Sequence, residues 1–270
     1  MEDFKKSFPA RFINVGVAEQ AMIGLAAGLA QRGFKPFCYT IATFALFRAY
    51  EFIRCDLAYQ NLPVTIVGMG AGLAYPTLGG THQAIEDVAV AMACPNMTVL
   101  APCDPAEVVE CACWCAGRES GGPIYLRIGK VGEPNLTAGA APWEFGKPRW
   151  LRKHNDLHRH PLILTYGPIA SVALAVADFC KADVLAISTL TDLTMLWDYL
   201  HGDVIVIEEA VGAPLGTFIK AEAAGWAPGL SSVRLFALSR EFNHTYGSRD
   251  ELLAYYDLTA EKIIEQVGQP

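Results

Sequence analysis

The chain has 270 residues, which is enough for one large domain or two smaller ones. With 52% hydrophobic and 18% charged residues, the composition is that of a folded protein with a large core, and it excludes a disordered chain. The formal net charge is −7 and no run of Lys or Arg occurs, so we expect neither nucleic acid nor a membrane as a partner. No apolar run reaches the ~18–20 residues that span a bilayer, and no signal peptide is evident, which favours a cytoplasmic protein.

Helical and strand-like segments alternate along the first half of the chain. Helical spacing is found over residues 15–31, 44–60, 83–92 and 105–116. Short apolar strand patterns occupy residues 35–40, 63–67, 97–100 and 123–127. A glycine-rich loop covers residues 69–80. This alternation predicts a parallel sheet with helices on both faces.

The composition becomes polar and rich in Gly and Pro after Gly129, and the alternation then restarts. Strands are predicted over residues 162–166, 184–187, 204–208 and 233–237, and helices over 169–178, 194–200, 212–224 and from 248 onward. We therefore predict an α/β fold of two domains, each a mainly parallel sheet flanked by helices. The domains cover residues 1–135 and 161–270, and residues 136–160 form a linker.

Three of the eight cysteines alternate along one predicted helix, at Cys111, Cys113 and Cys115. Side chains two residues apart on a helix diverge by about 200°, so these three do not readily share one metal ion. Zinc and iron–sulfur sites more often use paired C-x-x-C motifs, which this segment lacks. We therefore interpret the cysteines as small apolar core residues.

Two features near the N-terminus could carry chemistry, and each also has a structural explanation. Glu19 lies in the first turns of a helix of small and apolar residues, where a carboxylate either stabilises the helix end or has a chemical task. Phe44, Phe47 and Tyr50 recur every three residues, which places them along one side of a helix. Such a stripe is typical of core packing, and it could also form a platform for a flat heteroaromatic ring.

Two further candidates follow along the chain. His82 lies where the glycine-rich loop turns into a helix, which suits either a structural histidine or a proton donor beside a ligand. Arg127 ends a predicted strand. Ligands of open parallel sheets gather at the carboxyl ends of strands, so Arg127 suits phosphate binding, with a salt bridge as the alternative.

Taken together and in this order, the motifs resemble a known family. The pyrimidine-binding domain of transketolases is similar to RFINVGVAEQAM, TFALFRAYEFIR, GGTHQAIEDVAVAMACPNMTVLAPCDPAE and YLRIGK. The transketolase C-terminal domain is similar to TYGPIASVALAVADF and VIVIEEAVGAPLG. The resemblance covers residues 10 to 265 and implies thiamine diphosphate as the cofactor.

The resemblance also implies roles for the candidate residues. Glu19 would hydrogen-bond the aminopyrimidine ring of the cofactor and promote the imino form that takes the thiazolium proton. The positions lining the pyrimidine pocket would be Phe44, Phe47 and Tyr50.

Within the substrate region, the resemblance makes His82 a residue that faces the substrate and assists proton movement or oxyanion stabilisation. Arg127 would bind the phosphate end of the substrate. Many transketolases have a histidine where this chain has Gly70 and an aspartate where it has Leu78. The loss of these two sugar-binding side chains implies an unusual substrate.

No GDG motif occurs in the chain, whereas the family uses GDG followed by an asparagine to hold the diphosphate and Mg²⁺. We therefore expect a second subunit to carry the diphosphate-binding domain and the Mg²⁺ ligands. We also expect two copies of this chain to pair within a heterotetramer.

The leading hypothesis is one subunit of a split transketolase, which transfers a two-carbon ketol unit from a ketose phosphate to an acceptor. One alternative is the β-type subunit of a 2-oxo acid dehydrogenase or a hybrid enzyme, which passes its acyl or ketol group to a lipoyl or thiol carrier. Another is a non-catalytic scaffold. Because Glu19 and the aromatic trio are retained, the sequence favours an enzyme over a scaffold.

Overall fold

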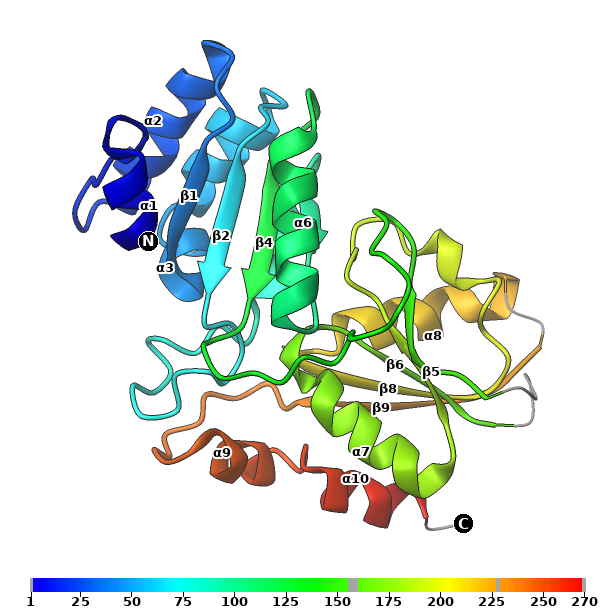
Figure 1. Ribbon diagram of the computed structural model, residues 1–270. Helices are drawn as coiled ribbons and strands as arrows, with labels where there is room; N and C mark the ends of the chain where they lie inside the picture. The colour runs from blue at the N-terminus through cyan, green and yellow to red at the C-terminus, as the bar shows by residue number, and fades with distance from the viewer. Residues whose placement is uncertain (1, 155–159, 227–228, 269–270) are drawn as a thin grey trace.

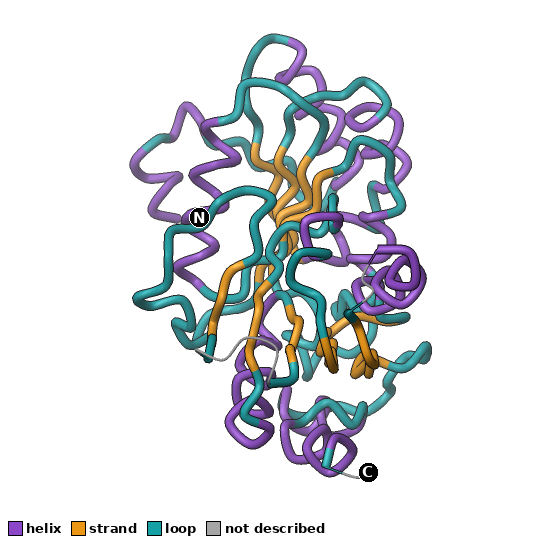
Figure 2. The backbone as a smooth tube through the Cα atoms, turned by 90° about the vertical axis from the view of Figure 1, so that its right-hand side faces the viewer, coloured by secondary structure: helices purple, strands orange, loops and turns teal. Residues whose placement is uncertain are grey.

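The computed structural model describes residues 2–154, 160–226 and 229–268. These residues form two α/β units, each built on one sheet, and the two chain ends lie on opposite sides of the molecule (Figure 1). The tube view shows the two groups of strands one above the other, with helices along their flanks (Figure 2). The fold class expected from the alternation is therefore confirmed.

The first sheet has four parallel strands in the order β1-β2-β4-β3. The strands are β1 (Phe37–Ile41), β2 (Thr65–Met69), β3 (Thr98–Leu100) and β4 (Ile124–Ile128). Alternate side chains point to opposite faces. Ile66 and Tyr125 belong to the core on the side of α2, whereas Val67 and Leu126 belong to the core under α6. Both faces are thus covered, as in other parallel sheets.

The helices of the first unit are α1 (Glu2–Ser7), α2 (Glu19–Gln31), α3 (Ala42–Leu46), α4 (Tyr50–Phe52), α5 (Asp87–Met92) and α6 (Pro105–Gly117), with the 3-10 helix η1 (Pro9–Arg11) and the π-helix η2 (Ile53–Ala58), which directly continues α4. The prediction of one helix over residues 44–60 is wrong. A turn separates α3 from α4, because Ala49 has φ −114° and ψ 16°, outside the helical range. The aromatic positions therefore do not share one continuous stripe.

The second sheet has five strands in the order β5-β7-β6-β8-β9, and only β5 is antiparallel to its neighbour. The strands are β5 (Arg149–Arg152), β6 (Leu162–Thr165), β7 (Asp183–Ala186), β8 (Gly202–Val211) and β9 (Leu230–Leu238). The helices are α7 (Ala170–Cys180), α8 (Pro214–Trp226), α9 (Arg249–Tyr255) and α10 (Ala260–Val267), with the 3-10 turns η3 (Gly167–Ile169) and η4 (Thr194–Leu196). The helix expected over residues 194–200 is reduced to η4.

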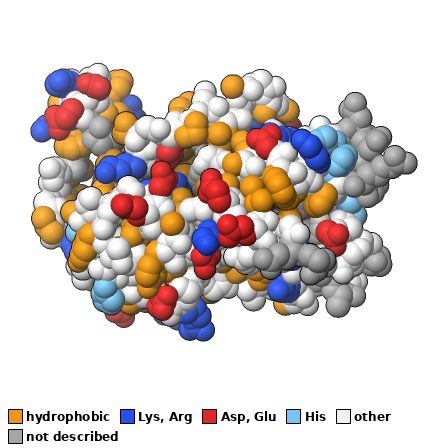
Figure 3. Space-filling model, turned by 90° about the horizontal axis from the view of Figure 1, so that it is seen from below, with side chains coloured by type: hydrophobic (Ala, Val, Ile, Leu, Met, Phe, Trp, Pro, Cys, Tyr) orange, Lys and Arg blue, Asp and Glu red, His pale blue; other side chains and the backbone are white. Residues whose placement is uncertain are grey.

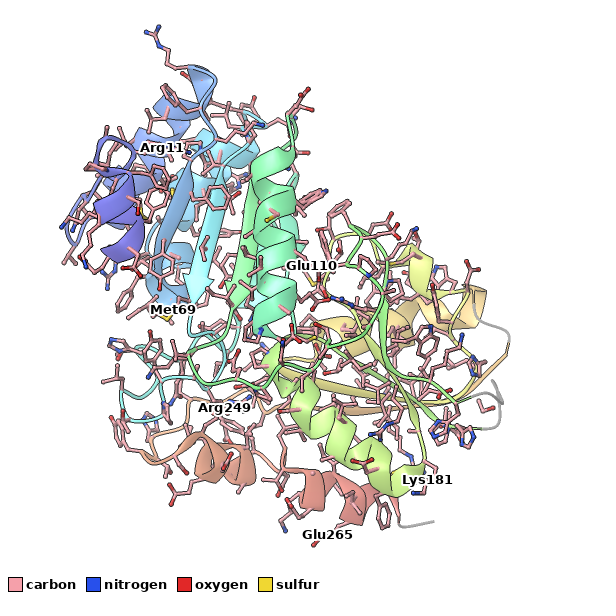
Figure 4. The ribbon with its side chains drawn as sticks, in the orientation of Figure 1. Arg11, Met69, Glu110, Lys181, Arg249 and Glu265 are labelled. Atoms are coloured by element: carbon pink, nitrogen blue, oxygen red, sulfur yellow. The ribbon has the colours of Figure 1, made fainter. Side chains whose placement is uncertain are left out.

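Strand β5 lies inside the segment that the sequence predicts to be a linker. It pairs with β7, and buried Arg149 contacts Glu107 and Glu110 of α6. Figure 4 shows Glu110 on the side of α6 that faces the second unit. Part of the predicted linker is therefore an edge strand of the second sheet, held to the first unit by ion pairs.

The two units share one continuous core. Side chains of α2 and of the second sheet, such as Ile23 and Leu164, belong to the same hydrophobic cluster. Backbone hydrogen bonds cross the boundary, from Ala101 N to Ser188 O at 2.7 Å and from Val211 N to Ile85 O at 2.7 Å. The relative position of the units is therefore fixed by packing and by backbone pairing.

The cysteines are free thiols. Cys111 and Cys115 are buried in the core under α6, whereas Cys113 on the same helix is exposed. Within the described ranges no group of three or more His, Cys, Asp or Glu side chains is arranged to hold a metal ion. None of the helices in the described part of the chain has the length and apolar character required to cross a membrane.

Candidate active site

Glu19 is the first residue of α2 and is only 6% exposed. Its Oε2 accepts a hydrogen bond from Nη1 of Arg48 at 3.1 Å, which forms an ion pair between α2 and the turn that follows α3. The side chain of Arg48 is 40% exposed, against 8% for that of Glu19. A largely buried carboxylate is thus paired with a cation that still faces solvent.

A series of aromatic contacts lies next to this ion pair. The guanidinium of Arg48 lies 4.1 Å from the centre of the Phe44 ring, in a cation–π contact. The ring of Phe44 meets His82 edge-on, with centroids 5.1 Å apart, and His82 in turn lies 6.1 Å from Tyr75. Side chains of α2, α3, the turn after α3, and the glycine-rich loop with the turn that follows it therefore meet here. We call Glu19, Arg48, Phe44, His82 and Tyr75 the Glu19 cluster.

Local backbone contacts fix the position of His82. Its N–H donates to Gly79 O at 2.9 Å, and its Nδ1 lies 2.9 Å from Oγ1 of Thr81. An antiparallel bridge between Gly72 and Ala84 closes the glycine-rich loop on both sides of this turn. His82 therefore lies in a turn after the glycine-rich loop, which is tied down at its base. The helix predicted to follow it directly, over residues 83–92, begins only at Asp87.

The structure separates the three aromatic residues that the sequence groups together. Phe44 belongs to the Glu19 cluster, whereas Phe47 and Tyr50 are half-buried and pack against the hydrophobic core. The hydroxyl of Tyr50 donates to Val90 O at 3.4 Å, and burial raises its pKa. Of the three, Phe44 is the one whose ring contacts both His82 and Arg48, the ion-pair partner of Glu19.

Arg127 is enclosed in the interior at 1% exposure. Its Nε donates to Oδ2 of Asp87 at 2.9 Å, and its Nη2 donates to Glu209 O at 3.0 Å. Burial alone lowers the pKa of the guanidinium, but the Asp87 carboxylate outweighs this and raises it, so the group stays charged. In this arrangement Nε and Nη2 of Arg127 already donate to protein groups.

A wider polar network surrounds this pair at the junction of the two units. Tyr125 donates to Asp87 at 2.8 Å, while Glu209 pairs with Arg249 and accepts from Leu73 N at 2.6 Å. Figure 4 shows Arg249 near the junction between the loop after β2 and the C-terminal helices. The network joins β4, β8, α9 and the glycine-rich loop, which favours a structural role for Arg127.

The two departures from the family pattern have different structural settings. Gly70 has φ +70°, and a Cβ there would lie 2.1 Å from Cε2 of Tyr75. Tyr75 thus fills the space that a side chain at position 70 would need, so a histidine there would require Tyr75 to move. Leu78, by contrast, is 47% exposed at the tip of the loop.

Two buried polar residues adjoin members of the Glu19 cluster in the sequence. Thr43 precedes Phe44 and Gln83 follows His82, and both are more than nine-tenths buried. The Thr43 hydroxyl and both polar atoms of the Gln83 amide have no hydrogen-bond partner among the described residues. Orphaned polar atoms are costly in a folded protein, so these groups are candidates for hydrogen bonds to a bound ligand.

Sequence reasoning missed two members of the cluster, Arg48 and Tyr75. Arg48 lies within the motif TFALFRAY, and Tyr75 lies within the glycine-rich loop. The sequence signals were a cation directly after Phe47 and an aromatic residue inside the loop that precedes His82. Their contacts with Glu19 and His82 depend on distances that no spacing rule along the chain provides.

Comparisons with known proteins define the family. Residues 1–131 match the model described as "Transketolase, pyrimidine binding domain". A protein of Methanocaldococcus jannaschii named "Putative transketolase C-terminal section" is 33% identical, over 98% of this chain and 84% of the relative. One of the apulose-4-phosphate transketolase subunits of Phocaeicola vulgatus is 30% identical, over 97% of this chain and 84% of the relative. The chain belongs to the transketolase family.

A solved structure narrows this to one part of the family. The protein described as "Split gene transketolase, inactive beta4 tetramer" superimposes with a TM-score of 0.84 and 32% identity, over 98% of this chain and 86% of that one. A transketolase from Leishmania mexicana, at 20% identity, matches in fold with a TM-score of 0.70, but the chain spans only 36% of it. The chain therefore corresponds to the C-terminal part of a transketolase, and the resemblance expected from its motifs is confirmed.

Proposed function

We propose that this chain is one subunit of a two-component, thiamine-diphosphate-dependent transketolase and carries the half-site for the aminopyrimidine ring. The observation that carries the proposal is the Glu19 carboxylate, buried at the start of α2 and linked through Arg48 to the ring of Phe44, which in turn meets His82. Among the described residues its ion-pair partner is the half-exposed Arg48, so the carboxylate can exchange this partner for a ligand.

Thiamine diphosphate supplies the carbanion chemistry by which a carbon–carbon bond next to a ketone is broken and remade. In this chain, Glu19 would bind the ring nitrogen of the aminopyrimidine and hold a proton there. Phe44 would support the ring by stacking, and Thr43 and Gln83, which adjoin Phe44 and His82 in the sequence, have unpaired polar atoms. His82 would face the substrate and move a proton at its oxygen, since its ring is only half-buried.

A second subunit would supply the diphosphate and Mg²⁺ site. The sequence lacks the GDG motif, and the similar proteins include one named as a transketolase subunit and one described as an inactive tetramer. We propose a homodimer of this chain within a heterotetramer, with residues 1–135 as the pyrimidine-binding domain.

The lower face of the molecule presents acidic and basic side chains interspersed with apolar ones, rather than charges of one sign only (Figure 3).

The donor would be a ketose phosphate and the transferred group a two-carbon ketol unit. The filled space at Gly70 and the apolar Leu78 remove two sugar-binding side chains, so the acceptor would differ from that of ordinary transketolases. Acyl transfer to a lipoyl or thiol carrier is not favoured, because the curated relatives reported above are named as transketolase parts.

The test compares Glu19→Gln with the wild type after reconstitution with the partner subunit, thiamine diphosphate and Mg²⁺. We expect turnover of a ketose phosphate to fall by about 100-fold or more, the range of an acid–base role. Thermal stability should change little, since glutamine has the same shape.

Glu261→Gln, at the exposed first turn of α10, is the matched control and should leave turnover unchanged. If the Glu19→Gln complex keeps more than about a tenth of wild-type turnover, Glu19 has no acid–base role. If the isolated chain turns over robustly, the two-component proposal is wrong.

A further inference from the structure

The guanidinium of Arg48 contacts both of the groups that would bind an aminopyrimidine ring in this half-site, Glu19 and Phe44. One N–H group donates to the Glu19 carboxylate at 3.1 Å, and the cation lies 4.1 Å from the centre of the Phe44 ring. We propose that Arg48 is an internal competitor of the cofactor: it holds the aminopyrimidine position closed until thiamine diphosphate displaces it. This inference rests on the proposed function, because it takes Glu19 and Phe44 as the ring-binding groups.

The chemistry of the two groups supports the competition. A guanidinium is planar, presents N–H donors in one plane and stacks on aromatic faces. An aminopyrimidine is also planar, and its ring nitrogen donates an N–H to a carboxylate when that nitrogen carries a proton. A carboxylate that accepts from one of these groups is therefore shaped to accept from the other, and the two cannot occupy the same Phe44 face and the same Oε2 together.

The setting of Arg48 allows it to leave. Its side chain is 40% exposed and starts from the turn between α3 and α4 rather than from the middle of a helix. Rotation of its flexible stem would carry the charge into water, where a guanidinium is well solvated. Glu19 cannot follow, because its side chain is only 8% exposed on the first turn of α2. The carboxylate therefore stays in place and changes partner.

The closed arrangement also explains how the subunit tolerates a buried carboxylate when no ring is bound. Without Arg48, the carboxylate would be left without an ion-pair partner among the described residues, which is unfavourable in a largely dry site. With Arg48 in place the charge is compensated and the exposed face of Phe44 is covered. The arginine thus stabilises the empty half-site and lowers the apparent affinity for the cofactor.

The strength of the competition follows from the two contacts. A partly exposed ion pair and a cation–π contact each change an equilibrium by roughly two- to fivefold. Because both must be broken, removal of the guanidinium should tighten binding of thiamine diphosphate by about five- to twentyfold.

The experiment measures the Kd of thiamine diphosphate with Mg²⁺ by calorimetry on the chain reconstituted with its partner subunit. Arg48→Met keeps the length and apolar stem of the side chain but removes the planar cation. Arg32→Met is the matched control. Arg32 is exposed and directly follows the C-terminal end of α2, whereas Glu19 begins that helix. We expect a five- to twentyfold lower Kd for Arg48→Met and an unchanged Kd for Arg32→Met.

Two further variants separate competition from other roles. Arg48→Lys keeps the charge without the planar group and should tighten binding by less than Arg48→Met. In a Glu19→Gln background, Arg48→Met should lose most of its effect, because the shared carboxylate is gone. An equal or weaker affinity for Arg48→Met in the wild-type background would overturn the inference. If the wild-type complex and all variants fail to bind thiamine diphosphate, the proposed function itself is wrong.

Discussion

The buried ion pair between Arg127 and Asp87 provides a decisive test of whether Arg127 is structural or binds substrate. The perturbation is Arg127→Met, which keeps the apolar stem and removes the charge. The two side chains are 1% and 0% exposed and 2.9 Å apart, so the variant leaves the Asp87 carboxylate buried without its cation. Breaking one side of a buried pair costs about 3–5 kcal/mol of the free energy of unfolding.

The same variant also loses the hydrogen bond from Arg127 to Glu209 O, which joins the two units. For a chain of this size, 1 kcal/mol corresponds to about 2–4 °C in Tm, so we expect Tm to fall by roughly 10 °C. The assay is thermal and urea unfolding of the chain, followed by circular dichroism. The double variant Arg127→Met/Asp87→Asn removes both charges and keeps an acceptor for the Tyr125 hydroxyl, so it should regain at least half of the lost stability.

A different pattern would refute this reasoning. If Arg127→Met unfolds at the wild-type temperature and instead raises the KM for the ketose phosphate in the reconstituted enzyme, the residue binds substrate as the family resemblance implies. The ion pair would then be a contact that the substrate displaces.

Two other predictions concern the glycine-rich loop and the second unit. Gly70→Ala should lower the free energy of unfolding by about 1–3 kcal/mol, because alanine is strained at a φ of +70° and its Cβ collides with Tyr75. The double variant Gly70→Ala/Tyr75→Ala should relieve the collision but not the backbone strain. Urea unfolding measures both effects. Burial raises the pKa of Glu208 to about 7, above its ordinary 4.5, so the folded form retains a proton that the unfolded form releases. The stability contributed by protonated Glu208 is complete below about pH 4.5 and is lost as the pH rises through about 7. Glu208→Gln should therefore remove roughly 3 kcal/mol of pH dependence from the free energy of unfolding measured between pH 4.5 and 8.

The alternation of short apolar strands with helical segments was sufficient to predict the fold class. Such runs as PVTIV carry their own signal, because both faces of a parallel strand are buried. Strand β5 could not be found in this way. Its sequence RWLR looks like exposed surface, and Arg149 is buried only because Glu107 and Glu110, about 40 residues earlier, lie next to it in space.

The candidate site was predicted less completely than the fold. Glu19 and His82 were identified as positions, and the structure brings both into one cluster through Phe44. Phe47 and Tyr50 do not share one side of a helix with Phe44, because the chain turns between α3 and α4 where one straight helix was predicted. Arg48 was missed for the same reason, since its contact with Glu19 depends on where that turn points.

Two buried carboxylates of the first unit show why Glu19 is the better candidate for chemistry. Asp104 caps α6 and accepts from Glu107 N, Leu136 N, and both the N–H and the hydroxyl of Thr137; burial raises its pKa, but these hydrogen bonds outweigh burial and lower it. It has no capacity left for a ligand, and its role is to hold the following loop in place. Glu19 is almost as buried, but its ion-pair partner is a side chain that can move into solvent. Folding thus leaves Glu19 buried with a partner that a ligand can replace, and a half-site shared with another subunit requires such a carboxylate.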